Sequence, residues 1–244
     1  MKPTITPIHE IVQAHYSKAA RSSSSCCSSS KAIYPEEILN ELPADISEFS
    51  LGCGNPIHAA ALLTGEIVLD LGSGGGLDCF LAARRVGNTG KIIGVDMTVE
   101  MLERARENSS KLGFTNVEFR EGFLENLPVE ENSVDVIISN CVINLSPDKT
   151  RVFQEIFRVL KPGGRLAVSD IVTNGQLPES VRNNMEAWGA CVAGALDMQD
   201  YSMGLETAGF EEIKVLPKTY SDELLHVIPV GQPFSAIITA HKPI

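Results

Sequence analysis

The cysteines are the residues of this chain whose positions most suggest chemistry. Cys53 lies in a glycine turn, Cys141 directly follows an apolar run, and Cys191 lies among small residues. No two cysteines have the C-x2-C spacing that is typical of a zinc site. Three isolated thiols that folding brings together would instead suit a soft, thiophilic centre. Trivalent arsenic is such a centre, because it binds three sulfurs and keeps a lone pair that could attack a sulfonium methyl group held in contact with it.

The other three cysteines lead to different predictions. Cys79 falls in a predicted helix beside apolar residues, so we expect it in the core, where cysteine behaves as a small hydrophobic residue. Cys26 and Cys27 interrupt a run of serines over residues 22–30. Such a composition cannot bury enough apolar surface to order itself, so we expect a mobile loop there.

A glycine-rich turn suggests a second kind of chemistry. Residues 72–76 read Gly-Ser-Gly-Gly-Gly between a predicted strand and a predicted helix, where glycines let a ligand approach the backbone closely. The nicotinamide-type fingerprint needs a further glycine at the position of Leu77. Asp70, just before the turn, would suit a cationic group such as the ammonium or sulfonium of S-adenosylmethionine. Asp96 ends the next strand, where a carboxylate can accept hydrogen bonds from ribose hydroxyls.

Residues 121–125 follow the third predicted strand and extend the candidate ligand site. Ligands of open α/β sheets collect at the carboxyl ends of strands near the switch point. Phe123 and Leu124 would then flank an adenine ring. Two alternatives stay open: Phe123 as a plain core residue, and the glycine turn as a means of packing helix on strand.

Alternating strands and helices must position these groups. Apolar runs rich in strand formers predict strands at residues 67–71, 91–96, 117–120, 134–139, 165–170, 212–216 and 235–240. Helical spacing, with Thr98 as an N-cap, predicts helices at residues 77–86, 98–111, 149–160, 179–188 and 199–208. Strands that alternate with helices indicate an α/β, Rossmann-like fold. We expect a mostly parallel seven-stranded sheet with helices on both faces and an antiparallel last strand.

The first part of the chain is less regular. Helical spacing predicts a helix over residues 8–20 and short helices at 36–41 and 57–63. We therefore expect residues 1–64 to form a cover segment of helices and loops, which includes the serine–cysteine stretch. Residues 65–244 are expected to form the main domain, with a substrate-cover insertion near 175–198.

The composition narrows the class of protein. The chain has 244 residues, of which 43% are hydrophobic and 21% charged, so it is long enough to bury a core without disulfides. It carries 31 acidic against 20 basic residues, which argues against a nucleic-acid partner. No apolar run is long enough to cross a bilayer, and the first residues do not resemble a signal peptide. We expect no membrane partner and a cytoplasmic location, where thiols are kept reduced.

Taken together, the motifs resemble the arsenite S-adenosylmethionine methyltransferase family over about residues 16–210. Many methyltransferases share the glycine turn. The segments that carry the three isolated thiols are more diagnostic, and they span residues 51–56, 139–149 and 188–196. The resemblance implies a class I methyltransferase that moves a methyl group from S-adenosylmethionine to the trivalent arsenic of arsenite, in arsenic detoxification.

The same resemblance implies roles for individual residues. Cys53, Cys141 and Cys191 would bind arsenic as substrate. Cys26 or Cys27 would be the fourth family cysteine, which takes part in thiol–disulfide cycling and needs a reductant such as thioredoxin or glutathione. We expect a monomer. The implied cofactor contacts are Tyr16, Asp70, Gly72, Gly74, Asp96, Met97, Gly122, Phe123, Leu124 and Asn140.

The chain departs from the family pattern in places, and two other functions stay open. Many class I methyltransferases have an aspartate where Phe123 falls, so the adenine contact here would come from backbone groups. The chain is shorter than the long family members, which leaves the final methylation number open. A methylase of a small organic substrate such as a quinone would need Asp96 but not the three thiols. A non-catalytic metalloid-binding protein would bind arsenite through its thiols and transfer no methyl group.

Overall fold

The computed structural model of the chain describes residues 5–21, 33–47, 49, 52–182, 184, 188, 191–218 and 231–244. Cys26 and Cys27 lie outside the described residues, and so does the serine stretch in which the loop was expected. None of the helices in the described ranges is long and apolar enough to span a membrane.

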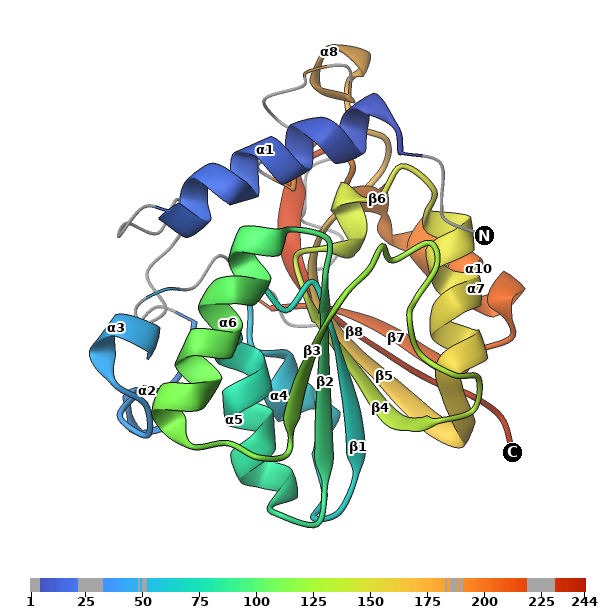
Figure 1. Cartoon of the computed structure of the whole chain (residues 1–244). Coiled ribbons are helices and arrows are strands. Elements are labelled where there is room, and N and C mark those ends of the chain that lie inside the picture. The colour runs from blue at the N-terminus through green and yellow to red at the C-terminus, as the bar shows by residue number, and fades with distance from the viewer. Residues whose placement is uncertain are drawn as a thin grey trace.

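A mostly parallel sheet forms the centre of the molecule (Figure 1). In the described part of the chain it has eight strands, in the order β3-β2-β1-β4-β5-β8-β7 with β6 beside β5. Strands β1 to β5 pair in parallel, and β8 runs antiparallel between β5 and β7. The bounds are β1 Ile67–Leu71, β2 Lys91–Asp96, β3 Val117–Glu121, β4 Val134–Asn140, β5 Leu160–Thr173, β6 Leu196–Asp197, β7 Glu211–Pro217 and β8 Pro233–His241.

This topology confirms the predicted α/β, Rossmann-like fold with an antiparallel last strand. The two-residue β6, which pairs with the end of β5, is an addition to the seven strands expected. The strand order changes side at β1: β2 and β3 lie on one side of β1, and β4 lies on the other. Such a switch point is where ligands of open α/β sheets bind.

Helices cover both faces of the sheet (Figure 1). One layer contains α4, α5 and α6, and the other contains α7 and α10. Neighbouring strand residues point to opposite layers, so Val68 packs in one core cluster and Leu69 in the other. Because the strands are buried on both faces, they appear in sequence as consecutive apolar residues. The helix bounds are α4 Pro56–Ala60, α5 Leu77–Val86, α6 Val99–Leu112, α7 Lys149–Val159 and α10 Met198–Ala208.

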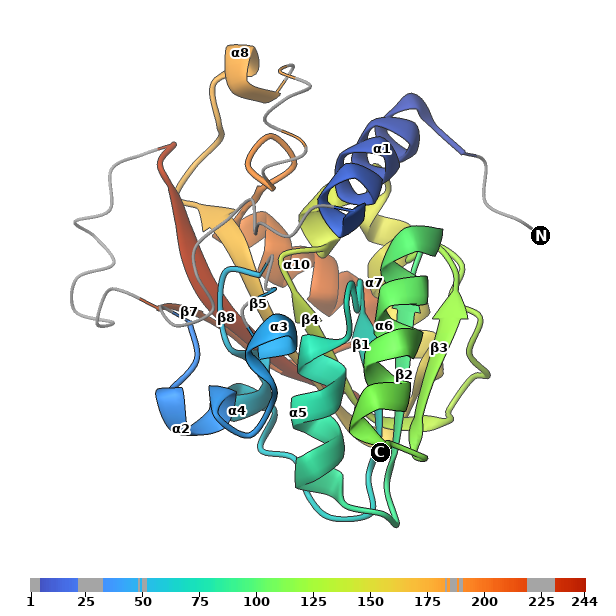
Figure 2. The same cartoon turned by 60° about the vertical axis from the view of Figure 1, so that its left-hand side comes forward.

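The N-terminal helix α1 (Pro7–Arg21) lies across the carboxyl end of the sheet, beside α6 (Figure 1). Its Val12 is fully buried against Cys141, Leu145 and Cys191. Figure 2 shows the short helices α2 (Glu36–Leu39) and α3 (Ala44–Ser47) on the same side of the sheet as α5. The predicted cover segment therefore contributes one helix to the ligand-binding edge of the sheet.

Several boundaries differ from the predicted ones for reasons of tertiary structure. Strand β5 begins at Leu160, not at residue 165, because Leu160 pairs with Val134 of β4 before a register shift, and the turn that follows is held to the chain end by the Gly163 amide, which donates to the Lys242 carbonyl at 2.9 Å. Thr98 occupies the N-cap position of α6, but its side chain makes no capping hydrogen bond. The helix predicted over residues 179–188 is described as α8, Glu179–Arg182, and several residues beyond it lie outside the described ranges.

Candidate functional site

One pocket at the carboxyl ends of β1, β2 and β4 gathers the residues predicted to contact a cofactor. α1 contributes its wall on one side, and the loops that follow the strands contribute the rest. The ten predicted residues all line this pocket: Tyr16, Asp70, Gly72, Gly74, Asp96, Met97, Gly122, Phe123, Leu124 and Asn140. Tyr16 and Asn140, which are 124 positions apart in sequence, thus face one ligand-sized space.

The glycine turn exposes backbone to the pocket. Gly72, Gly74 and Gly76 have φ angles of 67°, 49° and 91°, in the left-handed region that favours glycine. A side chain at Gly72 would overlap Val142, whereas open space lies where a Cβ atom of Gly74 would be. The hydroxyl of Ser73 is buried on the pocket wall and has no hydrogen-bond partner among the described residues. A bound ligand that offers an acceptor would satisfy it.

Asp96 is held at the pocket by backbone amides. Its Oδ2 accepts from the Gly74 amide at 2.9 Å, and its Oδ1 accepts from the Thr98 amide at 2.8 Å. Each carboxylate oxygen keeps a further lone pair, so the group can still accept from two vicinal hydroxyls. Burial raises the pKa of Asp96, and the amides of Thr98 and Gly74 oppose that rise.

Two further carboxylates, Asp70 and Asp78, are buried in the pocket wall. Burial and the neighbouring charge of Asp78 raise the pKa of Asp70 well above its usual range. Among the described residues no ion pair to Lys, Arg or His includes Asp70, Asp78 or Asp96. A cationic ligand would relieve this concentration of negative charge.

Cys79 is fully buried in the core cluster between α5 and the sheet, as predicted. Its thiol also donates to Asp70 Oδ2 at 3.2 Å, a contact that the sequence did not reveal. Burial and the charge of Asp70 raise the pKa of the Cys79 thiol, which keeps it protonated and unreactive.

Phe123 and Leu124, from the loop after β3, also line the pocket. The Phe123 ring is only half-buried and meets the His9 ring edge-on, with the two centroids 5.2 Å apart. Leu124 is partly buried and packs against the larger core cluster. The exposure of Phe123 to the pocket favours the ligand-contact interpretation over a plain core role.

A buried polar cluster in this part of the pocket was missed by sequence reasoning. His9 Nε2 lies 3.2 Å from Glu125 Oε1, and the Ser146 hydroxyl also donates to that oxygen. All three residues are buried and line the pocket. Together with the Gln13 side chain, which donates to the Met97 carbonyl at 2.7 Å, they fasten α1 over the site. A lone histidine on a helix and a glutamate after a strand carry no sequence signal for this contact.

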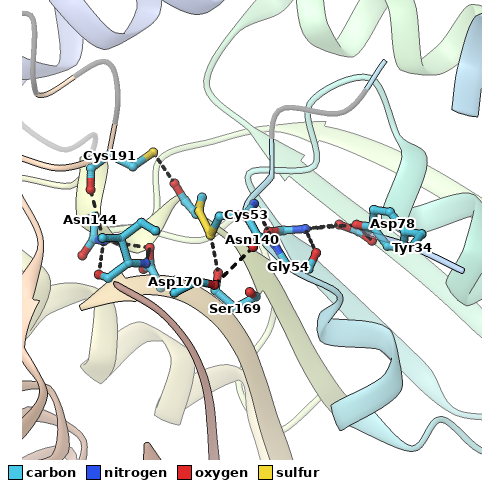
Figure 3. The surroundings of a disulfide bond; sticks show 12 residues. Tyr34, Cys53, Gly54, Asp78, Asn140, Asn144, Ser169, Asp170 and Cys191 are labelled. Carbon is cyan, nitrogen blue, oxygen red and sulfur yellow. Dashed lines mark hydrogen bonds between the residues drawn. A yellow bond between two sulfur atoms is a disulfide. The ribbon is translucent and has the colours of Figure 1, made fainter. Parts of the chain in front are cut away.

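The three isolated cysteines also come together, next to the same pocket (Figure 3). Cys53 and Cys141 are joined by a disulfide, with their Cα atoms 5.9 Å apart. The Cys191 thiol donates to the Cys141 carbonyl at 2.9 Å and lies 3.7 Å from the Tyr16 hydroxyl. Cys53 and Cys141 were expected as separate thiols; the structure corrects this by placing them within bonding distance of each other.

Two of these cysteines have an unusual backbone. Cys141 and Cys191 have φ angles of 60° and 61°, a region that costs a residue with a side chain about 1–3 kcal/mol. Surrounding hydrogen bonds hold both residues there: the Cys141 amide donates to the Ser169 carbonyl at 2.8 Å, and the Cys191 amide donates to the Trp188 carbonyl at 3.0 Å. Such strain is concentrated at functional sites.

Asn144 and Asp170 support the Cys191 loop from below (Figure 3). The Asn144 side-chain amide donates to Asp170 Oδ1 at 2.8 Å, to the Ile171 carbonyl at 2.6 Å and to the Cys191 carbonyl at 3.4 Å. Asp170 is fully buried, and burial raises its pKa to about 7. Nearby, burial lowers the pKa of Lys149 to about 8.

No group of three or more His, Cys, Asp or Glu side chains in the described ranges is arranged to hold a metal ion. Two of the three sulfurs proposed for arsenic are bonded to each other. The arrangement shown is therefore an oxidised form, and reduction of the disulfide would present three thiols beside the pocket.

Comparison with known proteins identifies the domain. A family model described as a methyltransferase domain matches residues 62–213. The crystal structure of an arsenic(III) S-adenosylmethionine methyltransferase from Chlamydomonas reinhardtii is similar, with a TM-score of 0.68 and 38% identity, covering 85% of this chain and 72% of that one.

Curated relatives agree with this structure. An arsenite methyltransferase from Halobacterium salinarum is 49% identical over 82% of this chain and 52% of its own length. An arsenite methyltransferase from Aquipseudomonas alcaligenes is 40% identical over 86% of this chain and 64% of its own length. The chain thus spans between half and two thirds of the length of these relatives.

Proposed function

Because the chain belongs to the family of arsenic(III) S-adenosylmethionine methyltransferases, we propose that it transfers a methyl group from S-adenosylmethionine to trivalent arsenic held by Cys53, Cys141 and Cys191. One observation carries the proposal: Cys141 lines the pocket of the glycine turn and also contacts the other two cysteines. A methyl donor in the pocket and an arsenic atom on the sulfurs would therefore be neighbours.

The pocket residues suit the proposed cofactor, which supplies an electrophilic methyl group on a sulfonium. Asp96 would accept hydrogen bonds from the ribose hydroxyls, since its two oxygens are already oriented by amides. Asp70 would stabilise the cationic end, and the unsatisfied Ser73 hydroxyl would donate to an acceptor of the ligand. Phe123 and Leu124 would enclose the adenine. The remaining predicted contacts, among them Tyr16 and Met97, would complete the enclosure.

Substrate binding requires the disulfide to be reduced. Two equivalents of a monothiol such as glutathione, or one equivalent of the thioredoxin dithiol, would convert the Cys53–Cys141 disulfide into two thiols and leave as a disulfide. Arsenite, As(OH)3, would then exchange its three hydroxyls for three thiolates, and the thiol protons would leave in three molecules of water. Cys26 or Cys27 is proposed to relay the exchange, and the need for reductant suits a cytoplasmic location.

Methyl transfer itself needs no base on the protein. The arsenic lone pair would form the new bond to carbon, and the electron pair of the broken carbon–sulfur bond would return to the sulfonium sulfur. The role of the chain is to hold both reactants in contact, an effect worth on the order of 7 kcal/mol at best. Residues 1–64 and 175–198 are proposed to cover the reactants. One chain supplies every residue named, so we propose that a monomer is active.

Two competing functions make different demands on the chain. A methylase of a small organic substrate such as a quinone would have no use for the three clustered cysteines. A non-catalytic thiol protein that binds a metalloid would have no use for Asp96 and the glycine turn. The adjacency of the two sets of residues favours the arsenic methyltransferase.

Arsenic speciation after incubation with arsenite, S-adenosylmethionine and a thiol tests the proposal. We expect methylated arsenic from the wild type, and a loss of about a hundredfold or more from Cys141→Ser and Cys191→Ser, because an oxygen ligand does not replace a soft thiolate on arsenic. Cys79→Ser is the matched control: it removes a cysteine while keeping a donor toward Asp70. Only inorganic arsenic from the wild type with several reductants, or full activity in both cysteine variants, would contradict the proposal.

A further inference from the structure

Asn140 lies between Cys53 on one side and Asp78 and Tyr34 on the other (Figure 3), and it also lines the cofactor pocket. It is the last residue of β4 and directly precedes Cys141. Its Oδ1 accepts from the Cys53 amide at 2.9 Å and from the Gly54 amide at 3.2 Å. One side chain therefore fixes the backbone of Cys53, while the main chain of the same residue leads into Cys141.

The other end of the same side chain points to the pocket wall. Nδ2 donates to the Gly54 carbonyl at 2.7 Å, to the Tyr34 hydroxyl at 3.0 Å and to Asp78 Oδ2 at 3.1 Å. The Tyr34 hydroxyl in turn donates to Asp78 Oδ1 at 2.7 Å. Asn140 and Asp78 both line the pocket. A planar amide holds its oxygen and nitrogen in fixed relative positions, so the Cys53 backbone and Asp78 contact one rigid group.

The glycines on either side of Cys53 are explained by this arrangement. A side chain at Gly52 would overlap the Asn140 carboxamide, and one at Gly54 would overlap the side chain of Ser169. Only glycine lets the Cys53 turn approach Asn140 of β4 and Ser169 of β5 this closely. The turn is thus shaped to receive the Asn140 side chain.

We propose that Asn140 is a positioning residue that couples the cofactor pocket to the arsenic-binding thiols, by holding Cys53 and Asp78 at opposite ends of one amide. The inference rests on the proposed function and deepens it. Its amide is already engaged with protein groups on both sides, so its main role differs from that of a simple cofactor contact. A cofactor that orders Asp78 would also order Cys53, and arsenic on Cys53 would order Asp78.

Such coupling is reciprocal, so it is measurable from either ligand. In reduced wild-type protein we expect S-adenosylhomocysteine, which cannot donate a methyl group, to tighten arsenite binding by about fivefold or more, the lower end of typical coupling between sites. A phosphine reductant keeps the cysteines reduced without competing for arsenite. Trp188 fluorescence reports arsenite, because the Trp188 carbonyl accepts the Cys191 amide at 3.0 Å. Calorimetry reports S-adenosylhomocysteine.

Two variants test the role of the amide. Asn140→Ala removes both the acceptor and the donor of the side chain. We expect it to weaken arsenite binding by about tenfold, as the loss of a buried hydrogen bond does, and to abolish the coupling.

Asn140→Asp is isosteric and preserves packing, keeps an acceptor for the Cys53 amide, and places a like charge against Asp78. It should retain more of the arsenite affinity than Asn140→Ala but also lose the coupling. Because Asn140 lines the pocket, both variants should also lower the affinity for S-adenosylhomocysteine without arsenite, so the deciding readout is the ratio of arsenite affinities with and without S-adenosylhomocysteine.

The outcomes separate this inference from the proposed function. If both variants retain the coupling, or if they lose affinity for S-adenosylhomocysteine without arsenite while the coupling persists, the positioning role is wrong. A wild type that binds arsenite and S-adenosylhomocysteine without any coupling also overturns it, and leaves the proposed function standing. A reduced wild type that binds no arsenite overturns the proposed function, and this inference with it.

Discussion

The cofactor pocket and the thiol site lie side by side, yet they are built in opposite ways. The pocket takes its main polar groups from two short segments, Asp70 to Gly76 and Asp96 to Thr98, at the ends of adjacent strands. The thiol site takes its three sulfurs from segments that are 88 and 50 residues apart in sequence. The first is a property of one βαβ unit, whereas the second exists only when the whole chain has folded.

Their electrostatics differ as well. The pocket contains Asp70, Asp78 and Asp96, whose pKa values are all raised, mainly by burial, so it suits a ligand that brings positive charge. The thiol site has few charged groups in contact with sulfur and rests on the neutral amides of Asn140 and Asn144. The charged cofactor pocket thus suits the cationic methyl donor, and the neutral thiol site suits soft trivalent arsenic.

The largest expected effect is on the free energy of unfolding, and it arises at Asp170, which supports the Cys191 loop. Burial raises the pKa of Asp170 to about 7 in the folded state, so the folded chain holds a proton that the unfolded chain releases near pH 4. The contribution to stability is present at low pH and is lost as the pH rises toward 7. Asp170→Asn should therefore gain stability relative to wild type between pH 4.5 and pH 7.5, by up to about 4 kcal/mol.

Urea unfolding at both pH values measures this difference. Glu206→Gln is a suitable control, because it removes one negative charge from the exposed side of α10. Equal pH dependence in wild type and Asp170→Asn would show that Asp170 does not carry the buried proton.

Removal of the Asp96 carboxylate should weaken the binding of S-adenosylmethionine much more than the binding of arsenite. Asp96→Ala loses an acceptor fixed by two amides, and two charged hydrogen bonds to ribose are worth about 3 kcal/mol together, or about a hundredfold in affinity for S-adenosylmethionine. Arsenite binding by the reduced protein should change much less, since no thiol contacts Asp96 in the described part of the chain. Calorimetry with each ligand alone checks both statements; equal losses would mean that the two regions form one cooperative site.

The smallest effect is expected at the contact that fastens α1 over the pocket. His9→Ala removes the hydrogen bond to Glu125, so we expect the affinity for S-adenosylmethionine to fall about fivefold, which corresponds to about 1 kcal/mol. His9→Gln keeps a donor of similar reach and should recover most of the loss. Equal affinities in the wild type and in both variants would show that α1 closes over the pocket without this contact.

Local patterns made much of the fold predictable. Strands β1 and β2 and helix α5 begin and end at the predicted residues, because consecutive apolar residues are what a strand buried on both faces requires. The glycine turn and Asp96 were predictable for a related reason: left-handed φ angles at Gly72 and Gly74 restrict the residue type, and the carboxylate occupies a set place at a strand end. These constraints act on neighbouring residues.

Other features could not be read from the chain. The extension of β5 depends on the pairing of Leu160 with Val134 across a register shift, and the His9–Glu125 contact joins positions 116 residues apart. Neither leaves a periodic pattern. The disulfide between Cys53 and Cys141 was not foreseen, because spacing in sequence says nothing about distance between Cα atoms when a whole sheet intervenes.

The sequence by itself determined the parallel sheet, the glycine turn with its two carboxylates, and the presence of three thiols in unusual surroundings. Tertiary structure alone decided that the thiols meet at the pocket, that two of them can bond, and that Asn140 joins the two regions. The physical reason is the distance along the chain over which each constraint acts. Backbone dihedral preferences and burial on both faces of a strand act within a few residues, whereas the meeting of Cys53, Cys141 and Cys191 depends on the order of strands in the sheet.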